Sequence, residues 1–169
     1  NSKMVLTPRI GITGVSGLLG SHVANYLLKK KFKVLASSRR KPKINHKNFI
    51  WKKLDLSKKL EHKKINKVFR DIQCLVHVGA FVPKKDITMN KKILMKTNIN
   101  ASIDLAKWSQ IKNIHFIYIS GSVIYKHDKK NLESSSKFKE SKNYYVNSKI
   151  ISERKIINIF KNDNYNLTI

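Results

Sequence analysis

The sequence predicts an α/β fold built on a doubly wound parallel sheet. Short apolar runs alternate along the chain with longer segments that carry a helical pattern, and most of the glycines gather directly after the first apolar run. Strands that alternate with helices at this interval pair in parallel through right-handed crossover connections. We therefore expect the strand order 3-2-1-4-5-6 in a single domain that spans residues 1–169.

Each candidate strand is a short run rich in apolar and β-branched residues, bounded by polar residues or glycine. The runs lie at residues 9–13, 33–37, 49–52, 73–78 and 115–120, and a sixth begins at residue 166. Helical patterns occupy residues 22–31, 60–69, 87–108 and 144–160. In the first helix, Val23, Tyr26 and Leu27 share one face, so we expect all three side chains to be buried.

Positive charge dominates the composition, with 36 Lys+Arg against 10 Asp+Glu and a formal net charge of +26. Only five of the basic residues are Arg, and the lysines are spread over nearly every predicted loop and helix surface. Proteins that read nucleic acid rely on Arg and on a concentrated basic stripe. The composition therefore argues against nucleic acid as the primary partner.

The same composition excludes several other classes. The single Cys rules out a disulfide framework, and the six His show no spacing typical of zinc ligands, so we expect no metal. No apolar run approaches the ~18 residues of a membrane span, and the N-terminus lacks the layout of a signal peptide. We therefore expect a soluble, cytoplasmic protein with no membrane partner.

Four of the six glycines form the segment Gly11-Ile-Thr-Gly14-Val-Ser-Gly17-Leu-Leu-Gly20, between the first strand and the first helix. Glycines at this junction permit a tight turn and the close approach of a pyrophosphate, whose charge then meets the free N–H groups of the helix N-terminus. Gly79 and Gly121 end the fourth and fifth strands, on the same rim of the sheet. The pattern predicts a dinucleotide site on a Rossmann fold, and the alternative is that these glycines only end strands and form turns.

The order and spacing of several motifs resemble the extended short-chain dehydrogenase/reductase family, the NAD(P)-dependent sugar epimerases and dehydratases. The segment Thr13-Gly14-x-x-Gly17-x-x-Gly20-Ser21-His22 is similar to the opening fingerprint of that family. Asp55-Leu56 resembles its acidic position that contacts adenine, and His77-Val78-Gly79-Ala80 resembles its segment beside the cofactor. Asn98 falls where the family has an Asn in its fourth helix.

This resemblance implies a nicotinamide dinucleotide as the cofactor. At the end of the second strand, sites that prefer NAD place an Asp or Glu that bonds the ribose 2′-hydroxyl. Here Arg39 and Arg40 follow two serines, with no carboxylate, and guanidinium groups suit a 2′-phosphate, so we expect NADP(H) in preference to NAD(H). The predicted cofactor-binding residues are Gly11, Thr13, Gly14, Ser16, Gly17, Leu18, Leu19, Gly20, Arg39, Arg40, Asp55, Leu56, Gly79, Ala80, Asn98 and Lys149.

The segment Tyr145-Val-Asn-Ser-Lys149 fits the catalytic Tyr-x-x-x-Lys of the resembled family, and Glu153 follows as an acidic residue usually does there. The same pattern occurs at residues 26–30 and 125–129, so the position in the predicted fold has to decide which match is catalytic. Tyr145 and Lys149 lie one turn apart on the helix after the fifth strand, where both can face the glycine rim. The alternative is a surface Tyr beside one more solvated Lys.

A phenol with an ordinary pKa near 10 needs a neighbouring cation to act as a base near neutral pH, and Lys149 would supply one. The resemblance implies that Tyr145 exchanges a proton with the substrate during hydride transfer and that Lys149 also bonds the nicotinamide ribose. Gly121 departs from the family, which usually has Ser or Thr there. Ser120 or Ser122 could replace that hydroxyl, and alternation along the strand favours Ser122, although both can equally be turn residues.

The leading function is that of a nucleotide-sugar epimerase, dehydratase or reductase. Two alternatives stay open: an NADPH-dependent reductase of a non-sugar ketone, and a non-catalytic dinucleotide-binding module, which Gly121 makes possible. Residues 166–169 resemble the start of the sixth strand, after which members of the resembled family continue into a smaller substrate domain. We therefore expect that domain to be missing, with weak cofactor binding and no turnover by this chain alone, and homodimerisation is one option for the full-length protein.

Overall fold

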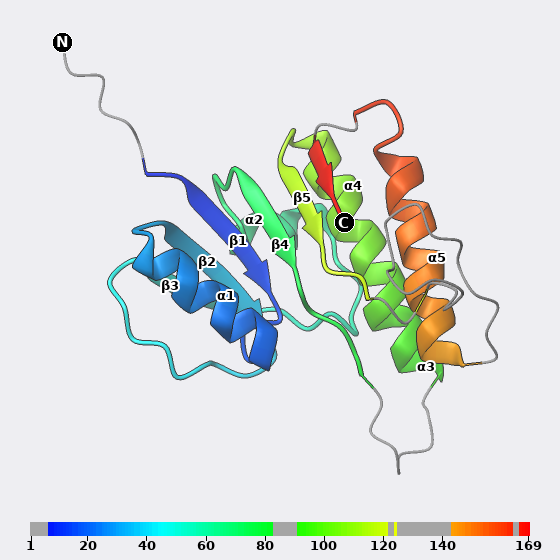
Figure 1. The fold of residues 1–169 in the computed structure, drawn as a ribbon, viewed down its shortest axis with the longest axis horizontal. Coiled ribbons are helices and arrows are strands. Elements are labelled where there is room, and N and C mark those ends of the chain that lie inside the picture. The colour runs from blue at the N-terminus through cyan, green and yellow to red at the C-terminus, as the bar shows by residue number, and fades with distance from the viewer. Residues whose placement is uncertain (1–6, 83–90, 122–123, 125–142, 164–165) are drawn as a thin grey trace, which may run out of the picture.

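Six parallel strands form one sheet in the order β3-β2-β1-β4-β5-β6, which confirms the predicted topology (Figure 1). The computed structural model of the chain describes residues 7–82, 91–121, 124, 143–163 and 166–169. The observed strand ends lie close to the predicted ones. The strands are β1 (Arg9–Thr13), β2 (Lys33–Ser38), β3 (Phe49–Lys53), β4 (Cys74–His77), β5 (His115–Tyr118) and β6 (Leu167–Thr168).

Helices connect the strands, and one of them contains a wider turn. They are α1 (Leu18–Lys29), α2 (His62–Val68), α3 (Lys91–Leu94), α4 (Ala101–Ile111) and α5 (Tyr144–Ile159), with the π-helical turn η1 (Met95–Asn100) between α3 and α4. A pattern with 3.6 residues per turn does not reveal a π turn, so the sequence predicts this region as one ordinary helix. In the part of the chain that the structure describes, no helix is both long and apolar enough to cross a membrane.

Two apolar cores lie on the two faces of the sheet because alternate strand residues point to opposite sides. On one face, Leu75 and Phe116 pack with residues of α2, α4 and α5. On the other face, Val34 and Val76 pack with Ala24 of α1. Figure 1 shows α1 set apart from α4 and α5, next to the strands of the first half of the chain.

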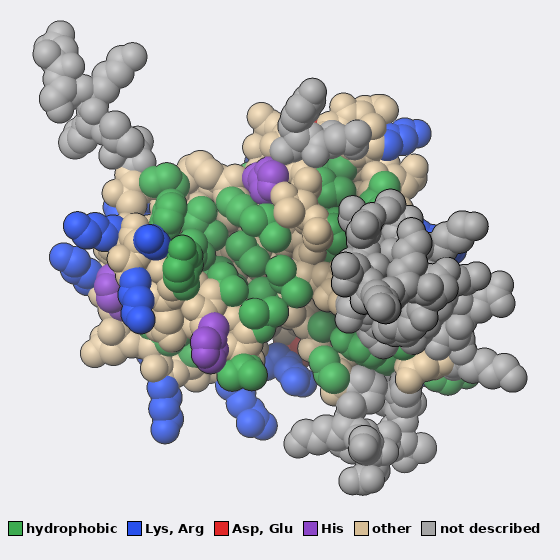
Figure 2. All heavy atoms as spheres, in the orientation of Figure 1, with side chains coloured by type: hydrophobic (Ala, Val, Ile, Leu, Met, Phe, Trp, Pro, Cys, Tyr) green, Lys and Arg blue, Asp and Glu red, His purple; other side chains and the backbone are tan. Residues whose placement is uncertain are grey.

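The face of the sheet that carries α1 remains partly accessible along β4 and β5. Cys74, Val78, Ile117 and Ile119, which lie in or just after these strands, are only half-buried. Figure 2 shows a broad hydrophobic area on this side, over β1, β4 and β5. Among the described residues, α1 therefore covers only the part of this face that lies near β1 and β2.

The prediction that Tyr26 is buried is wrong, since its side chain is 61% exposed. The stripe of α1 that meets the sheet consists of Gly20, Ala24 and Leu28, spaced four residues apart. The small residues at positions 20 and 24 allow the helix to approach the strands closely, and this orientation turns Tyr26 toward solvent. Val23 and Leu27 are half-buried.

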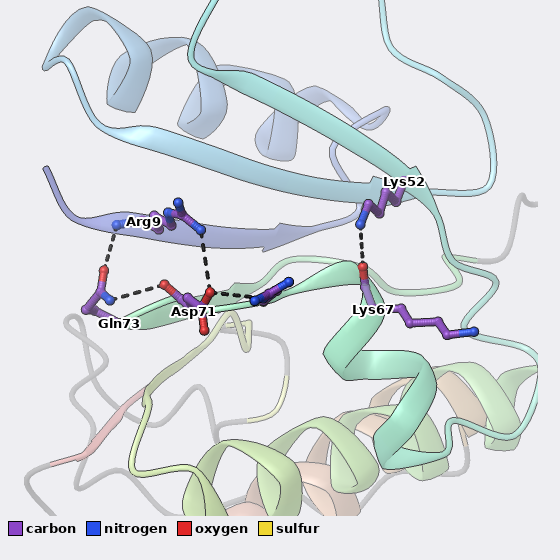
Figure 3. Close-up of polar contacts among 6 residues, drawn as sticks. Arg9, Lys52, Lys67, Asp71 and Gln73 are labelled. Carbon is purple, nitrogen blue, oxygen red and sulfur yellow. Dashed lines mark hydrogen bonds and ion pairs between the residues drawn. The ribbon is translucent and has the colours of Figure 1, made fainter.

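Polar contacts join neighbouring elements on the side of the sheet away from α1 (Figure 3). The Arg9 N–H donates to Gln73 Oε1 at 2.7 Å, and the Arg9 guanidinium lies 3.8 Å from the Asp71 carboxylate. Lys52 Nζ donates to the Lys67 carbonyl oxygen at 2.6 Å and so satisfies an acceptor in the last turn of α2. These contacts hold β1 to the segment before β4, and β3 to α2.

Candidate active site

A cavity of about 480 Å³ opens at the carboxyl ends of the strands, the place where open α/β sheets bind ligands. It brings together the glycine segment, the end of β2, the segments after β3 and β4, and the first turns of α5. The predicted site residues that line it are Gly14, Ser16, Gly17, Leu18, Leu19, Gly20, Arg39, Asp55, Leu56, Gly79, Ala80, Ser120, Tyr145 and Lys149.

Some predicted cofactor-binding residues lie outside this lining. Gly11 is buried in β1, where a Cβ atom would lie 2.7 Å from Ile72 Cδ1, so the glycine serves packing. Arg40 is exposed, and its carbonyl oxygen accepts a hydrogen bond of 2.5 Å from Ser38 Oγ. The predicted residues that do not line the cavity are Gly11, Thr13, Arg40 and Asn98.

Two glycines shape the turn between β1 and α1. Gly14 has a φ of +72°, in the left-handed region, and a Cβ atom there would lie 2.7 Å from the Cα atom of Gly79. A Cβ atom at Gly20 would collide with the carbonyl oxygen of Gly14. The backbone of the turn therefore touches the segment after β4, and side chains at these positions would disrupt the cradle that the turn forms.

The N-terminus of α1 opens into this cradle. Gly17 is the N-cap and supplies no side-chain hydrogen bond, and the first turn contains no acidic residue. The first N–H groups of a helix have no partner within it and, together with the helix dipole, favour an anion. Leu18 and Leu19 are exposed beside these N–H groups. Because both side chains are uncharged, neither competes with an anion for the N–H groups. The cradle fits a pyrophosphate group.

Asp55 presents a fixed carboxylate to the cavity. Its Oδ1 atom accepts hydrogen bonds from Ser57 Oγ at 2.7 Å and from the Ser57 N–H at 2.9 Å. Burial raises the pKa of Asp55, but these hydrogen bonds and the charges of Arg39 and Lys58 outweigh burial and hold the pKa below its usual range. Ser57 was not predicted, although an Asp followed two residues later by Ser is a recognisable turn signal.

Thr13 and His77 begin a buried hydrogen-bond chain beneath the cradle. Thr13 Oγ1 accepts from the Gly79 N–H at 3.0 Å and lies 2.6 Å from His77 Nδ1. His77 Nε2 lies 2.8 Å from Ser102 Oγ, which donates to the Asn98 carbonyl oxygen. Because Ser102 donates its proton to Asn98, it accepts from His77 Nε2, and in a neutral imidazole Nδ1 then accepts from Thr13. A neutral imidazole therefore satisfies this series of hydrogen bonds.

The buried His77 predicts a specific pH dependence of stability. Burial, with a contribution from the Lys149 charge, lowers the pKa of His77 from 6.5 to about 3. The stabilisation from neutral His77 is therefore fully present above pH 6.5 and is lost as the pH falls toward 3. Between these values, its contribution to the free energy of unfolding should fall by up to about 1.4 kcal/mol per pH unit. Urea unfolding of the wild type and His77→Gln over this range measures the slope.

The control for this prediction is His62→Gln, since His62 is exposed at the start of α2. His77→Gln should be less stable than the wild type at neutral pH but should lose less stability on acidification. His62→Gln should follow the wild type at every pH. A wild-type slope in His77→Gln would contradict the assignment.

Asn98 holds the segment after β4 to the helices. Its Oδ1 atom accepts from the Phe81 N–H at 2.7 Å, and its Nδ2 atom donates to the Phe81 carbonyl oxygen at 3.0 Å. Nδ2 also lies 3.2 Å from Ser148 Oγ on α5, and Ser152 Oγ donates to the Asn98 carbonyl oxygen. Asn98 is therefore buried between backbone segments that it connects, and its predicted contact with the cofactor stays a prediction.

Tyr145 and Lys149 lie on α5 and both line the cavity, as the spacing predicts. Asn143 caps the helix, and its Oδ1 atom accepts from the N–H of Tyr145 at 2.9 Å. Lys149 is 4% exposed, and its Nζ atom donates to the Ile119 carbonyl oxygen at 2.8 Å. Burial raises the pKa of Tyr145 above its ordinary value and lowers the pKa of Lys149 to about 8. Lys149 does not lower the pKa of Tyr145 in this arrangement, because its ammonium is directed at the backbone just after β5.

Ser120 lines the cavity, but its hydroxyl is directed into the protein, where it donates to Glu153 Oε2. Ser122, the other predicted hydroxyl, lies outside the described residues. In the sequence, Glu153 stands out only as the acidic residue that follows the Tyr-x-x-x-Lys motif. That motif does not reveal the contact between Glu153 and Ser120. Among the described residues, no group of His, Cys, Asp or Glu could hold a metal ion.

Comparison with known proteins shows the family of the chain. Residues 10–169 match the NAD dependent epimerase/dehydratase family. A search of the curated proteins finds no match. Among solved structures, the chain is similar to WbmH from Bordetella bronchiseptica in complex with NAD+, with 21% sequence identity and a TM-score of 0.77 over 90% of this chain and 53% of that chain.

Two further solved structures have the same fold. UDP-glucuronic acid 4-epimerase from Bacillus cereus in complex with NAD is 20% identical, with a TM-score of 0.74 over 91% of this chain and 53% of that chain. The dTDP-glucose 4,6-dehydratase from Bacillus anthracis in complex with NAD is 16% identical, with a TM-score of 0.77 over 95% and 53%. The chain thus spans about half the length of these neighbours. Since the family match extends over nearly the whole chain, the resemblance predicted from its motifs is confirmed, and the chain belongs to the NAD dependent epimerase/dehydratase family.

Proposed function

We propose that this chain binds a nicotinamide dinucleotide in the cavity and takes part in hydride-transfer chemistry on a nucleotide sugar, as an epimerase or dehydratase. The observation that carries the proposal is that the glycine cradle, Tyr145 and buried Lys149 line one cavity. The neighbours from Bordetella and Bacillus, solved with NAD and in two cases named for UDP- or dTDP-sugars, support the cofactor and substrate class.

The residues present fit this cofactor at both ends. The glycine cradle and the N-terminus of α1 would hold the pyrophosphate. Asp55 and Arg39 would contact the adenosine end, and Tyr145 and Lys149 the nicotinamide ribose. When bound, the nicotinamide accepts or donates the hydride.

Tyr145 would move the proton that accompanies hydride transfer. Its phenol is neutral at pH 7, since burial raises its pKa, and it can donate directly to a substrate oxygen. To accept a proton it needs a positive charge nearby, which Lys149 would supply only when its ammonium turns from the Ile119 carbonyl oxygen toward the phenol.

We extend the proposal to NADP(H) as the preferred cofactor. Arg39 lines the cavity beside Ser37 and Ser38, and no carboxylate occupies the end of β2. Arg39→Ala should weaken NADPH binding by about tenfold, the effect of losing one charge-assisted hydrogen bond, and should change NADH binding little. Fluorescence titration of the reduced cofactors measures both dissociation constants.

Arg40→Ala is the matched control because Arg40 is the exposed neighbour that does not line the cavity. It should leave both dissociation constants near those of the wild type. Equal wild-type affinity for the two cofactors, or no loss with Arg39→Ala, would contradict the preference and leave NAD as the proposed cofactor. Failure of the wild type to bind either cofactor would contradict the proposed function itself.

A second candidate function is a non-catalytic dinucleotide-binding module. Gly121 stands where the resembled family has a hydroxyl, and the Ser120 hydroxyl donates to Glu153. Among the described residues at the end of β5, neither position therefore presents a free hydroxyl proton to the cavity. Since no turnover is expected of this chain alone, cofactor binding without nucleotide-sugar turnover by a longer form of the protein would favour this candidate.

A further inference from the structure

We infer that Glu153 is a positioning residue of the proposed active site, whose buried carboxylate fixes the Ser120 hydroxyl and maintains the positive charge of Lys149. The inference starts from burial. In a chain with a net charge of +26, Lys149 and Glu153 are the only Lys, Arg, Asp or Glu side chains that are buried among the described residues. They are 4% and 3% exposed. A buried charge is costly unless it is compensated, so the burial of two opposite charges one turn apart on the same helix is a specific feature of the fold.

Glu153 lies one helical turn after Lys149 on α5, so the two side chains project from the same face of the helix. This face meets the end of β5, where the Ser120 hydroxyl donates to Glu153 Oε2. Ser120 and Lys149 line the cavity, whereas Glu153 does not. The carboxylate therefore acts on the cavity through these two residues.

Among the described residues, the other contacts of Lys149 are neutral. Its Nζ atom donates to the Ile119 carbonyl oxygen at 2.8 Å and lies 4.4 Å from the centroid of the Tyr118 ring. A carbonyl dipole and an aromatic face both favour a cation, but neither carries a full negative charge. These contacts place the ammonium group without supplying a counter-charge.

The titratable groups around Lys149 have different effects on it. Burial lowers the pKa of Lys149 to about 8, and Glu153 acts in the opposite direction. Burial raises the pKa of Tyr118 on β5 and of Tyr145 on α5, so both phenols are neutral at pH 7. Burial also lowers the pKa of His77 on β4 to about 3, which leaves it neutral. Of these groups, Glu153 alone supplies the negative charge.

The role given to Lys149 rests on the proposed function, but the test measures Lys149 without any cofactor. The chain is labelled with ¹³C at lysine Cε, and the Lys149 signal is assigned by its loss in Lys149→Met. In the wild type this signal should titrate near pH 8. In Glu153→Gln, which keeps the size and removes the charge, it should titrate about one pH unit lower. Glu153→Asp, which restores the charge, should bring the value back toward that of the wild type.

The matched control is Glu61→Gln, an exposed carboxylate at the start of α2 that should leave the Lys149 titration unchanged. If Glu153→Gln does not fold, Ser120→Ala provides the measurement, because it removes the hydroxyl that donates to the Glu153 carboxylate and should shift the Lys149 titration. An unchanged Lys149 pKa in folded Glu153→Gln, or in folded Ser120→Ala when Glu153→Gln does not fold, would overturn the inference. Loss of cofactor binding by the wild type would instead overturn the proposed function and leave this titration intact.

Discussion

In a preparation of the protein that turns over a nucleotide sugar, replacement of Tyr145 by Phe is expected to lower that turnover by about 10²- to 10⁴-fold, the usual contribution of a positioned acid or base. The substitution removes the phenolic oxygen and keeps the ring in the cavity lining. The hydrogen bond from the residue 145 N–H to Asn143 Oδ1 is a backbone contact and should persist. Cofactor affinity should therefore change by less than about twofold, which separates a loss of chemistry from a loss of binding.

The neighbouring Tyr144 provides the control for this prediction. It is 47% exposed, and Lys91 Nζ lies 4.8 Å from its ring centroid, a contact that does not need the hydroxyl. Tyr144→Phe should therefore turn over substrate at the wild-type rate. The rates of the wild type, Tyr145→Phe and Tyr144→Phe are measured from the conversion of UDP- and dTDP-sugars and from the absorbance of the reduced nicotinamide. A wild-type rate for Tyr145→Phe would exclude Tyr145 as the acid or base.

Replacement of Gly14 by Ala is expected to lower the free energy of unfolding by about 3 kcal/mol and to weaken dinucleotide binding further. The substitution places a side chain in the left-handed region and brings its Cβ atom to 2.7 Å from Gly79 Cα. Backbone atoms on both sides of the contact cannot move aside as a side chain would. The midpoint of urea unfolding measures the loss of stability, and cofactor titration under folding conditions measures the loss of affinity.

Gly17→Ala tests whether this loss is specific to position 14. A Cβ atom at Gly17 would meet only the Gly14 carbonyl oxygen, at 3.3 Å, and the Gly17 backbone is extended. Its unfolding midpoint should lie much closer to that of the wild type. If the two variants unfold at the same urea concentration, the close contact between Gly14 and Gly79 does not determine the loss of stability.

The fold could be predicted because its signals are local in the sequence. Each strand is a short apolar run, and the glycine turn appears as a fixed spacing at a junction between a strand and a helix. The helix that carries Tyr145 and Lys149 begins at the predicted residue because Asn143 provides a strong local N-cap. The cavity follows from these elements, since parallel strands end at one rim.

The interior of the site could not be predicted because its partners are distant in the sequence. Thr13 and His77 share a register position of β1 and β4, and Ser120 meets Glu153 only after α5 packs against β5. The outward turn of Tyr26 likewise depends on how closely α1 approaches the sheet. Such contacts are set by tertiary packing, and residue type at a single position does not encode them.

The π-helical turn at residues 95–100 lets this helical segment hold one more residue than a regular α-helix over the same rotation. Each residue of a π turn rotates the backbone by less than a residue of an α-helix, so the extra residue is absorbed inside the turn and α3 and α4 keep their relative orientation. Asn98 lies inside the wider turn, where its side chain meets the backbone of Phe81. Loss of one residue between Asn98 and Ala101 should therefore displace Asn98 locally and leave the directions of α3 and α4 nearly unchanged.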